Sequence, residues 1–328
     1  MPTLDAHLPR SINQAAERLA AGGLVALPTE TVYGLGARAD DDAAVAAIFQ
    51  AKGRPADHPL IVHVASLDDA AYFGDLSAPA AQRLARRYWP GPLTLIVPRR
   101  TGVGAAAAGG QDSIGLRMPS HPAARALLEA AARRGVRGVA APSANRFGRV
   151  SPTRADHVRA EFGDDLLILD GGACDVGIES TIVDCTRSTP ALLRPGMLDR
   201  VAIEAITGVA LQAPGADAPR ASGTLEAHYA PTAKLRLMDA KALRSALEVL
   251  AGGEMPKGLA VYSRTLRAMP PGLLTRAMPQ HPGNAAQELF AALRDFDAQG
   301  ASLIWVESPP PGPDWEGVRD RLQRAAAA

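Results

Sequence analysis

Residues 52–64 read KGRPADHPLIVHV, and this stretch decides the fold class that we predict for the first half of the chain. Its last five residues, 60–64, are apolar apart from His63, and a short run that is apolar on both faces is typical of a strand buried in the middle of a sheet. The stretch begins at the end of a predicted helix, whose last residue is Lys52 and whose C-terminal stop is Gly53. A helix that leads into a central strand predicts an α/β domain.

More strands and helices are predicted on both sides of this stretch. Short apolar runs predict strands at 24–27, 93–97, 114–117, 138–141, 166–169, 181–184 and 191–193. Helical patterns are found at 15–21, 78–88, 122–134 and 154–162. Because the later strands follow one another without helices between them, strict strand–helix alternation fails. We therefore expect a mixed, twisted sheet rather than a doubly wound one.

The chain length and one stretch rich in Pro and Gly indicate two domains. A chain of 328 residues exceeds the size at which a single hydrophobic core usually stops growing. Residues 208–231 lack sustained hydrophobic periodicity, which is typical of a linker. We predict a first domain at 1–207, a linker at 208–231 and a second domain at 232–328. Alternating strands and helices in the last region favour a small parallel, Rossmann-like α/β unit.

The composition is that of a globular protein, with 47% apolar and 21% charged residues. A net charge of +1 argues against a protein that binds polyanions over its whole surface. The charge is unevenly distributed, because residues 52–154 hold 15 Lys and Arg against 6 Asp and Glu, and the remainder is net negative. This asymmetry favours a phosphate-bearing ligand, either a nucleotide or a nucleic acid, although exposed helix faces account for part of it.

Lysine is rare in this chain, which contains 31 Arg and only 4 Lys. Lys52 is the only lysine before Lys234. A compact ammonium group can make a point-charge contact with phosphate that a planar guanidinium does not reproduce. We therefore predict that Lys52 is chemically required.

Several classes of protein are excluded by what the sequence lacks. No apolar run approaches the roughly 18 to 20 residues of a membrane helix, and the first residues lack the pattern of a secretory signal, so we expect a cytoplasmic protein without membrane contact. Cys174 and Cys185 have no metal-ligand spacing and are expected in the core. The P-loop, dinucleotide-binding, zinc-protease and serine-hydrolase motifs are also missing.

Six polar segments lie at the ends of predicted strands, which is where binding and catalytic sites are usually built. They are PTETVYGLG (28–36), KGRPADHPLIVH (52–63), IGLRMPSHP (114–122), PSANRFGRVSPT (142–153), GIESTIVD (177–184) and LLRPG (192–196). They supply cations at Lys52, Arg54, Arg117, Arg149 and Arg194, and hydroxyls at Thr29, Thr31, Ser143, Ser151, Ser180 and Thr181. We expect these segments to converge on one positively lined cavity.

Taken together, these segments resemble the YrdC-like family. The KxR element (Lys52 and Arg54) and the SxN element (Ser143 and Asn145) stand as that family has them, and the other polar segments match as well. The resemblance covers residues 24 to about 208. The HYAP sequence at 228–231, followed by an α/β unit, looks like the two-domain form of the family. The resemblance therefore implies a YrdC-like catalytic domain, an interdomain lid and a C-terminal domain.

What the resemblance implies is an enzyme that joins L-threonine, bicarbonate and ATP into threonylcarbamoyl-AMP and releases pyrophosphate. Mg²⁺ is expected with the ATP, held mainly by the phosphates. The product would serve the modification of tRNA to threonylcarbamoyladenosine, so the implied partner is the downstream tRNA threonylcarbamoyl-transferase machinery, with at most a weak contact to tRNA itself.

The resemblance also assigns roles to residues. Catalysis would fall to Lys52, Arg54, Ser143 and Asn145. ATP would contact Lys52, Arg54, His58, Ser113, Ser143, Asn145, Ser151, Arg194 and the lid residue Tyr229. L-Threonine would contact Thr31, His63, Arg117, Ala141 and Ser180. His58 departs from the family, which often has Asn at that position.

Elementary chemistry agrees with these roles. A carboxylate calls for a planar, bidentate donor such as Arg117, and such a charge-assisted contact contributes roughly 1.5 to 3 kcal/mol. Charge that develops on phosphoryl oxygens calls for fixed cations rather than a covalent nucleophile.

Two alternatives stay open at the level of sequence. One is an RNA-binding module without catalysis, which the basic segment permits but the 4% aromatic content does not favour. The other is carbamoyl transfer in hydrogenase maturation, for which the expected acylphosphatase-like and zinc-finger segments are missing.

Overall fold

The computed structural model describes residues 2–215, 217–251, 253, 256–266 and 269–328. The chain divides into two compact units. The first contains Met1–Phe147 and Ser151–Thr224, and the second contains Gly148–Val150 and Leu225–Ala328. The division therefore falls inside the stretch 208–231 that we predicted as a linker. Ala216, in that stretch, lies outside the described residues.

The first unit is built around a mixed sheet of ten strands in the order β1-β8-β2-β3-β7-β4-β6-β5-β9-β10. The strands are β1 (Thr3–Asp5), β2 (Val25–Leu27), β3 (Gly34–Arg38), β4 (Ile61–His63), β5 (Leu93–Pro98), β6 (Ser113–Arg117), β7 (Val139–Ala140), β8 (Leu167–Asp170), β9 (Thr181–Asp184) and β10 (Ala191–Arg194). The helices are α1 (Pro9–Ala20), α2 (Asp42–Lys52), α3 (Leu67–Phe73), α4 (Pro79–Tyr88), α5 (Pro122–Ala132), α6 (Ala155–Phe162) and α7 (Arg200–Thr207), with a short 3-10 turn η1 (Gly163–Asp165). The predicted mixed sheet is confirmed.

The stretch 52–64 forms the structure predicted for it. The β4 strand lies inside the sheet, parallel to β6 and antiparallel to β7. The side chain of Asp41 caps the start of α2, and Gly53 ends this helix in the left-handed conformation, with φ 64°. Lys52 is therefore the last residue of a well-capped helix that points into the loop before a central strand.

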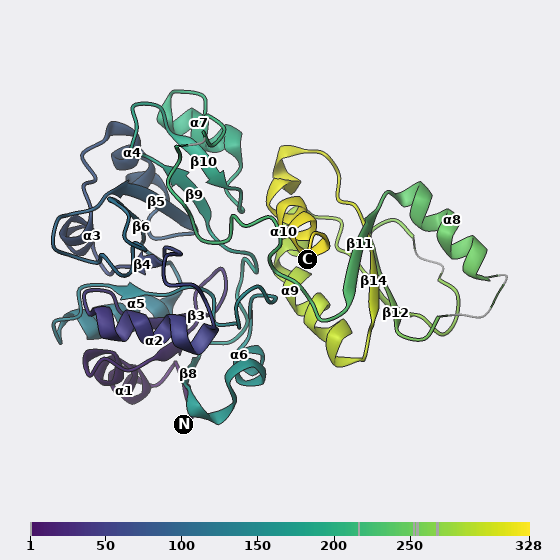
Figure 1. Cartoon of the computed structure of the whole chain (residues 1–328), viewed down its shortest axis with the longest axis horizontal. Coiled ribbons are helices and arrows are strands. Elements are labelled where there is room, and N and C mark those ends of the chain that lie inside the picture. The colour runs from purple at the N-terminus through teal and green to yellow at the C-terminus, as the bar shows by residue number, and fades with distance from the viewer. Residues whose placement is uncertain (1, 216, 252, 254–255, 267–268) are drawn as a thin grey trace. The chain divides into compact units, whose positions relative to one another are not determined.

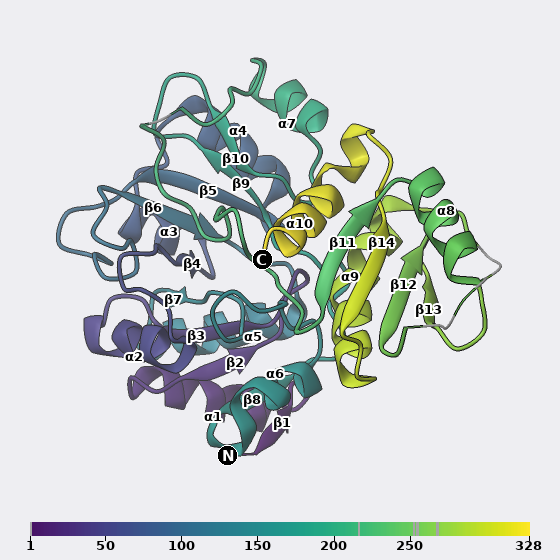
Figure 2. The same cartoon turned by 45° about the vertical axis from the view of Figure 1, so that its right-hand side comes forward.

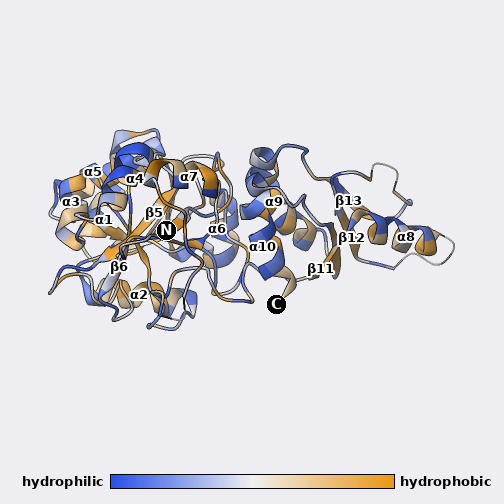
Figure 3. Cartoon of the chain, turned by 90° about the horizontal axis from the view of Figure 1, so that it is seen from above, coloured by the Kyte–Doolittle hydropathy of each residue, from blue (hydrophilic) through white to orange (hydrophobic). Residues whose placement is uncertain are grey.

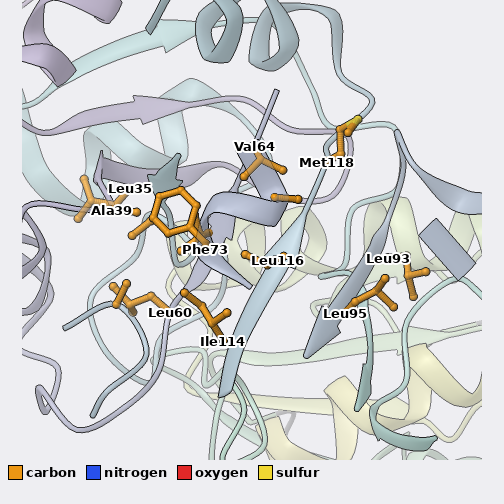
Figure 4. Close-up of a cluster of buried hydrophobic side chains, with 14 of the residues drawn as sticks. Leu35, Ala39, Leu60, Val64, Phe73, Leu93, Leu95, Ile114, Leu116 and Met118 are labelled. Carbon is orange, nitrogen blue, oxygen red and sulfur yellow. The ribbon is translucent and has the colours of Figure 1, made fainter. Parts of the chain in front are cut away.

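Alternate residues of the strands supply two cores, one on each face of the sheet. On one face, Leu27 and Leu167 pack with Leu19 of α1 and Leu127 of α5. The other face packs under α2, α3 and α4 in a larger cluster. Figure 4 shows part of it, with the ring of Phe73 among Leu35, Leu60, Ile114 and Leu116. Apolar residues concentrate on the inner strands β5 and β6 (Figure 3). Both faces of the sheet therefore contribute to the core.

The sequence analysis missed four elements of this unit: β1, β3, α3 and α7. Two of the five residues of β3 are glycines, which weakens any strand pattern. Gly36 is required there because a Cβ atom would lie 2.8 Å from both Leu27 and Val139 side-chain carbons. The close approach of neighbouring strands therefore requires glycine at position 36. Because glycine has a low strand propensity, the strand is not recognised in the sequence.

The second unit is the predicted small parallel α/β structure. Its sheet has the order β11-β14-β12-β13, and all of its pairings are parallel. Helices α9 and α10 cover one face and α8 the other (Figures 1 and 2). The element bounds are β11 (Lys234–Met238), α8 (Ala240–Ala251), β12 (Leu259–Ser263), β13 (Leu274–Ala277), α9 (Pro282–Ala298), β14 (Leu303–Glu307), the 3-10 turn η2 (Pro313–Trp315) and α10 (Glu316–Ala326). The β13 strand was not predicted.

Residues near the end of the first unit pack against side chains of its sheet. Ala218 and Ala221 pack against an apolar cluster that includes Ile61, Ile96 and Ile182. Among the described residues, no helix has the length and apolar character needed to cross a membrane.

Candidate active site

Strand direction brings four of the predicted site residues to one edge of the first unit's sheet. The parallel strands β4 and β6 end at His63 and Arg117, which are register partners. The β5 strand runs antiparallel to β6 and parallel to β9, so the start of β9, next to Ser180, lies at the edge where β6 ends. The antiparallel strand β10 ends there too, at Arg194. The mixed topology thus gathers residues that are far apart in the chain.

Arg117 is buried, and protein groups contact each of its three nitrogens. Its Nη1 donates to Thr31 Oγ1 at 2.8 Å, and its Nε donates to the carbonyl oxygen of Gly91 at 3.3 Å. Its Nη2 lies 2.8 Å from Oε1 of Glu30, which is also buried. Burial alone would raise the pKa of Glu30, but the charge and hydrogen bonding of Arg117 hold that pKa below its usual value. The pair is therefore an ionised, buried salt bridge.

His63 lies beside this pair as a neutral imidazole. Burial, and next the charge of Arg117, lower the pKa of His63 to about 3. Its Nδ1 atom is buried and has no hydrogen-bond partner among the described residues. At neutral pH this side chain can accept or donate a hydrogen bond, but it cannot act as a cation toward a carboxylate.

Ser180 is held by a second group of polar contacts. Its hydroxyl lies 2.7 Å from Thr94 Oγ1. Arg194 donates to its carbonyl oxygen from both Nε, at 3.1 Å, and Nη2, at 2.9 Å. Arg194 also contacts the last residues of the first unit, because its Nη1 donates to the carbonyl oxygen of Ser222 at 2.7 Å.

The two KxR residues have different surroundings. Lys52 Nζ contacts the carbonyl oxygens of Ser143, at 2.5 Å, and of Asn145. Burial, and next the charge of Arg54, hold the pKa of Lys52 well below its usual value. Arg54 donates from Nη2 to the carbonyl oxygen of Pro59 at 3.1 Å and to Ser222 Oγ at 3.3 Å. Ser222 therefore connects Arg54 with Arg194.

The other predicted site residues of the first unit have contacts of their own. The ring of His58 packs edge-on against Phe147, with 5.5 Å between the ring centroids, and burial followed by the charge of Arg54 lowers the pKa of His58. The hydroxyl of Ser151 donates to the buried carboxylate of Glu179. Ser113 lines a small cavity that Ser222 also lines. The backbone N–H of Ala141 donates to the carbonyl oxygen of Ile61 at 2.9 Å.

Two residues singled out in the sequence belong to the second unit. The ring of Tyr229 stacks on Phe290, with centroids 5.5 Å apart, and the guanidinium of Arg321 lies 5.2 Å from its centroid. Tyr229 has φ 62°, a left-handed conformation that is uncommon for such a residue. Arg149 lies 3.7 Å from Asp297. The role of Tyr229 as a lid residue that contacts ATP, and that of Arg149 as a cation for an anionic ligand, stay predictions.

Contacts within the first unit join the predicted site loops in pairs: Thr31 with Arg117, Ser180 with Arg194, and Lys52 with Ser143. A single cavity lined by all six segments stays a prediction. Sequence reasoning missed Glu30, Thr94, Glu179 and Ser222, all of which contact residues of this cluster. A signal for three of them was present, since Glu30 and Glu179 lie inside polar segments already singled out, and Thr94 interrupts the apolar run LTLIV. Nothing local marks Ser222.

A cationic, hydroxyl-lined edge of a mixed sheet, followed by a separate parallel α/β unit, defines a two-domain enzyme of the YrdC-like class. Residues 17–196 match the Sua5/YciO/YrdC family model, described as "Telomere recombination", and residues 196–327 match the C-terminal domain of threonylcarbamoyl-AMP synthase. The chain belongs to the threonylcarbamoyl-AMP synthase family, and it is an enzyme of that type.

Relatives and solved structures agree over nearly the full length. The threonylcarbamoyl-AMP synthase of Pyrococcus abyssi is 38% identical, with 96% of this chain and 94% of that protein covered. The synthase of Bacillus subtilis is 37% identical, with 96% and 92% covered. The crystal structure of P. abyssi Sua5 complexed with L-threonine superposes with a TM-score of 0.88 at 37% identity, covering 97% of this chain and 95% of that chain. A partial match, HypF of T. kodakarensis, covers 57% of this chain and 24% of that chain at 17% identity and a TM-score of 0.50, and it shows the fold alone.

Proposed function

We propose that this protein makes threonylcarbamoyl-AMP from L-threonine, bicarbonate and ATP and releases pyrophosphate. The observation that carries the proposal is the likeness, over 97% of the chain, to a Sua5 structure that holds L-threonine. The buried cluster of Arg117, His63 and Ser180 supports the same substrate, because it combines a cation, a neutral imidazole and hydroxyl groups in one place.

We assign threonine to the cluster that surrounds the Glu30–Arg117 pair. The pair is neutral as a whole and His63 is uncharged, so this part of the site suits a zwitterion rather than a strongly charged ligand. The residues assigned to threonine are Thr31, His63, Arg117, Ala141 and Ser180.

ATP falls to the neighbouring, net cationic part of the site. Arg54 and Arg194 both donate to Ser222, and both are guanidinium groups that match phosphate oxygens. The residues assigned to ATP are Lys52, Arg54, His58, Ser113, Ser143, Asn145, Ser151, Arg194 and Tyr229.

The reaction needs two bond-forming steps. The threonine amine, after loss of a proton, adds to the carbon of bicarbonate, water leaves, and a carbamate forms. A carbamate oxygen then attacks the α-phosphorus of ATP, and the bond to the pyrophosphate oxygen breaks. Fixed cations such as Arg54 and Arg194 stabilise the charge on the phosphoryl oxygens, and no protein nucleophile takes part.

We propose that Mg²⁺ enters this site with ATP. Among the described residues, no group of three or more His, Cys, Asp or Glu side chains is arranged to hold a metal. Mg²⁺ commonly keeps several waters and binds through substrate phosphates with few protein ligands. It would neutralise phosphate charge. The product carries an activated threonylcarbamoyl group, which a downstream enzyme can transfer to tRNA. We propose that this protein makes it in the cytoplasm.

The test is pyrophosphate release by the purified protein. We expect release that requires ATP, bicarbonate and L-threonine together, and much slower release with other amino acids. Arg194→Met should lower kcat/KM by at least 100-fold, whereas Arg236→Met, at an exposed position of β11, should leave it within twofold. Release that does not depend on threonine, or equal rates for the two variants, would contradict the proposal.

A further inference from the structure

The turn at residues 143–147 closes around the end of helix α2. Lys52 Nζ contacts the carbonyl oxygens of Ser143 and Asn145 from the helix side. The turn also donates to the helix end. The backbone N–H of Phe147 donates to the carbonyl oxygen of Lys52 at 2.9 Å, and the side-chain Nη1 of Arg146 donates to that of Ala51 at 3.0 Å. The last carbonyls of a helix lack intrahelical partners, so the turn and the helix end satisfy each other.

The opposite side of the turn is held by the loop before β3. The N–H of Ala144 donates to the carbonyl oxygen of Tyr33 at 2.8 Å, and Ser143 forms a β-bridge with Gly34. The SxN residues Ser143 and Asn145 are thus carried on a turn that is fixed from two sides. On the helix side, Lys52 is the side chain that reaches the turn's carbonyl oxygens at both of these residues.

The geometry explains why this position holds lysine in a chain with 31 Arg. Two carbonyl oxygens, two residues apart in the turn, converge on one nitrogen atom. A tetrahedral nitrogen can direct separate N–H bonds at both, whereas a guanidinium presents its donors in one plane and is larger. The pocket around Lys52 is closed, since the residue is only 3% exposed.

We infer that Lys52 is a positioning residue, which shapes the turn carrying Ser143 and Asn145, and that this role, rather than a contact with phosphate, is its main contribution to catalysis. Two of the N–H bonds of its amino group serve the turn. The inference deepens the proposed function and rests on it, because the SxN side chains matter only if they meet the nucleotide.

The test compares Lys52→Met and Lys52→Arg with a matched control, Lys234→Arg, at an exposed lysine of β11. Hydrogen exchange of peptides that span residues 142–148 is measured without ATP. We expect exchange at least tenfold faster in both Lys52 variants than in the control. We also expect kcat/KM for ATP to fall about 100-fold in both, with Lys52→Arg no better than Lys52→Met.

A phosphate contact predicts a different pattern. Exchange would match the control without ATP, and Lys52→Arg would keep most of the ATP affinity because its charge is retained; either result would overturn the inference. Should Lys52→Met fail to fold, Lys52→Arg alone decides. If the unmodified protein shows no threonine-dependent pyrophosphate release, the proposed function fails, but the exchange comparison still decides whether Lys52 holds the turn.

Discussion

Replacing His63 by Gln should flatten the dependence of stability on pH. Burial holds the imidazole of His63 neutral in the folded protein, with a pKa of about 3 against an ordinary value of 6.5. Below pH 6.5 the unfolded chain binds a proton that the folded protein does not, so stability falls as the pH is lowered, down to about pH 3. Between pH 7 and pH 5 this one group should remove about 2 kcal/mol of the free energy of unfolding.

The assay is urea unfolding at pH 7, 6 and 5, monitored through hydrogen exchange in peptides from the first unit. The readout is the difference between the original protein and His63→Gln. Other groups with shifted pKa values, including His58 and His121, are present in both proteins and cancel. Arg117 holds the pKa of Glu30 below its usual value, and this carboxylate is also present in both proteins. We expect the difference to change by about 2 kcal/mol, and a constant difference would refute the assignment of a buried neutral histidine.

Two further predictions concern buried charges. Arg117→Met should lower the free energy of unfolding of the first unit by about 3 to 5 kcal/mol, because Glu30 is left buried and unpaired. Adding Glu30→Gln should recover part of this loss. Urea unfolding of the single and the double variant measures both effects, and equal stability of these two variants would contradict the prediction. Glu307, at the end of β14, accepts hydrogen bonds from Ser263, at the end of β12, and from Thr265. Glu307→Gln weakens these contacts and should lower the stability of the second unit by about 1 to 3 kcal/mol, while the KM for threonine stays unchanged. Hydrogen exchange in the second unit measures the first effect, and the kinetics of pyrophosphate release measure the second.

Much of the fold could be predicted because it depends on local patterns. The apolar run 60–64 became an interior strand, and Asp41 and Gly53 bound the helix before it. Elements whose residues are selected by close packing escaped notice. The β3 strand contains two glycines, and at Gly36 the neighbouring side chains approach too closely for a Cβ atom.

The candidate site divides in the same way. The six polar segments contain Lys52, Arg117 and Arg194, and these residues could be singled out without knowledge of the fold because binding and catalytic residues concentrate in loops at strand ends. Their partners could not be read from the sequence, since Lys52 contacts carbonyl oxygens that every residue possesses. Glu30 could be seen, but not its pairing with a residue 87 positions later.

The sequence by itself determined most of the segments that form the sheet, the charged residues at the ends of those segments, and that a second α/β unit follows. Only the tertiary structure decided what those charges do. Strands that run in opposite directions bring the start of β9 beside the end of β6, so that Ser180, Arg194 and Arg117 share one edge. Strand direction depends on how the whole sheet buries its two faces, and no stretch of residues encodes that alone.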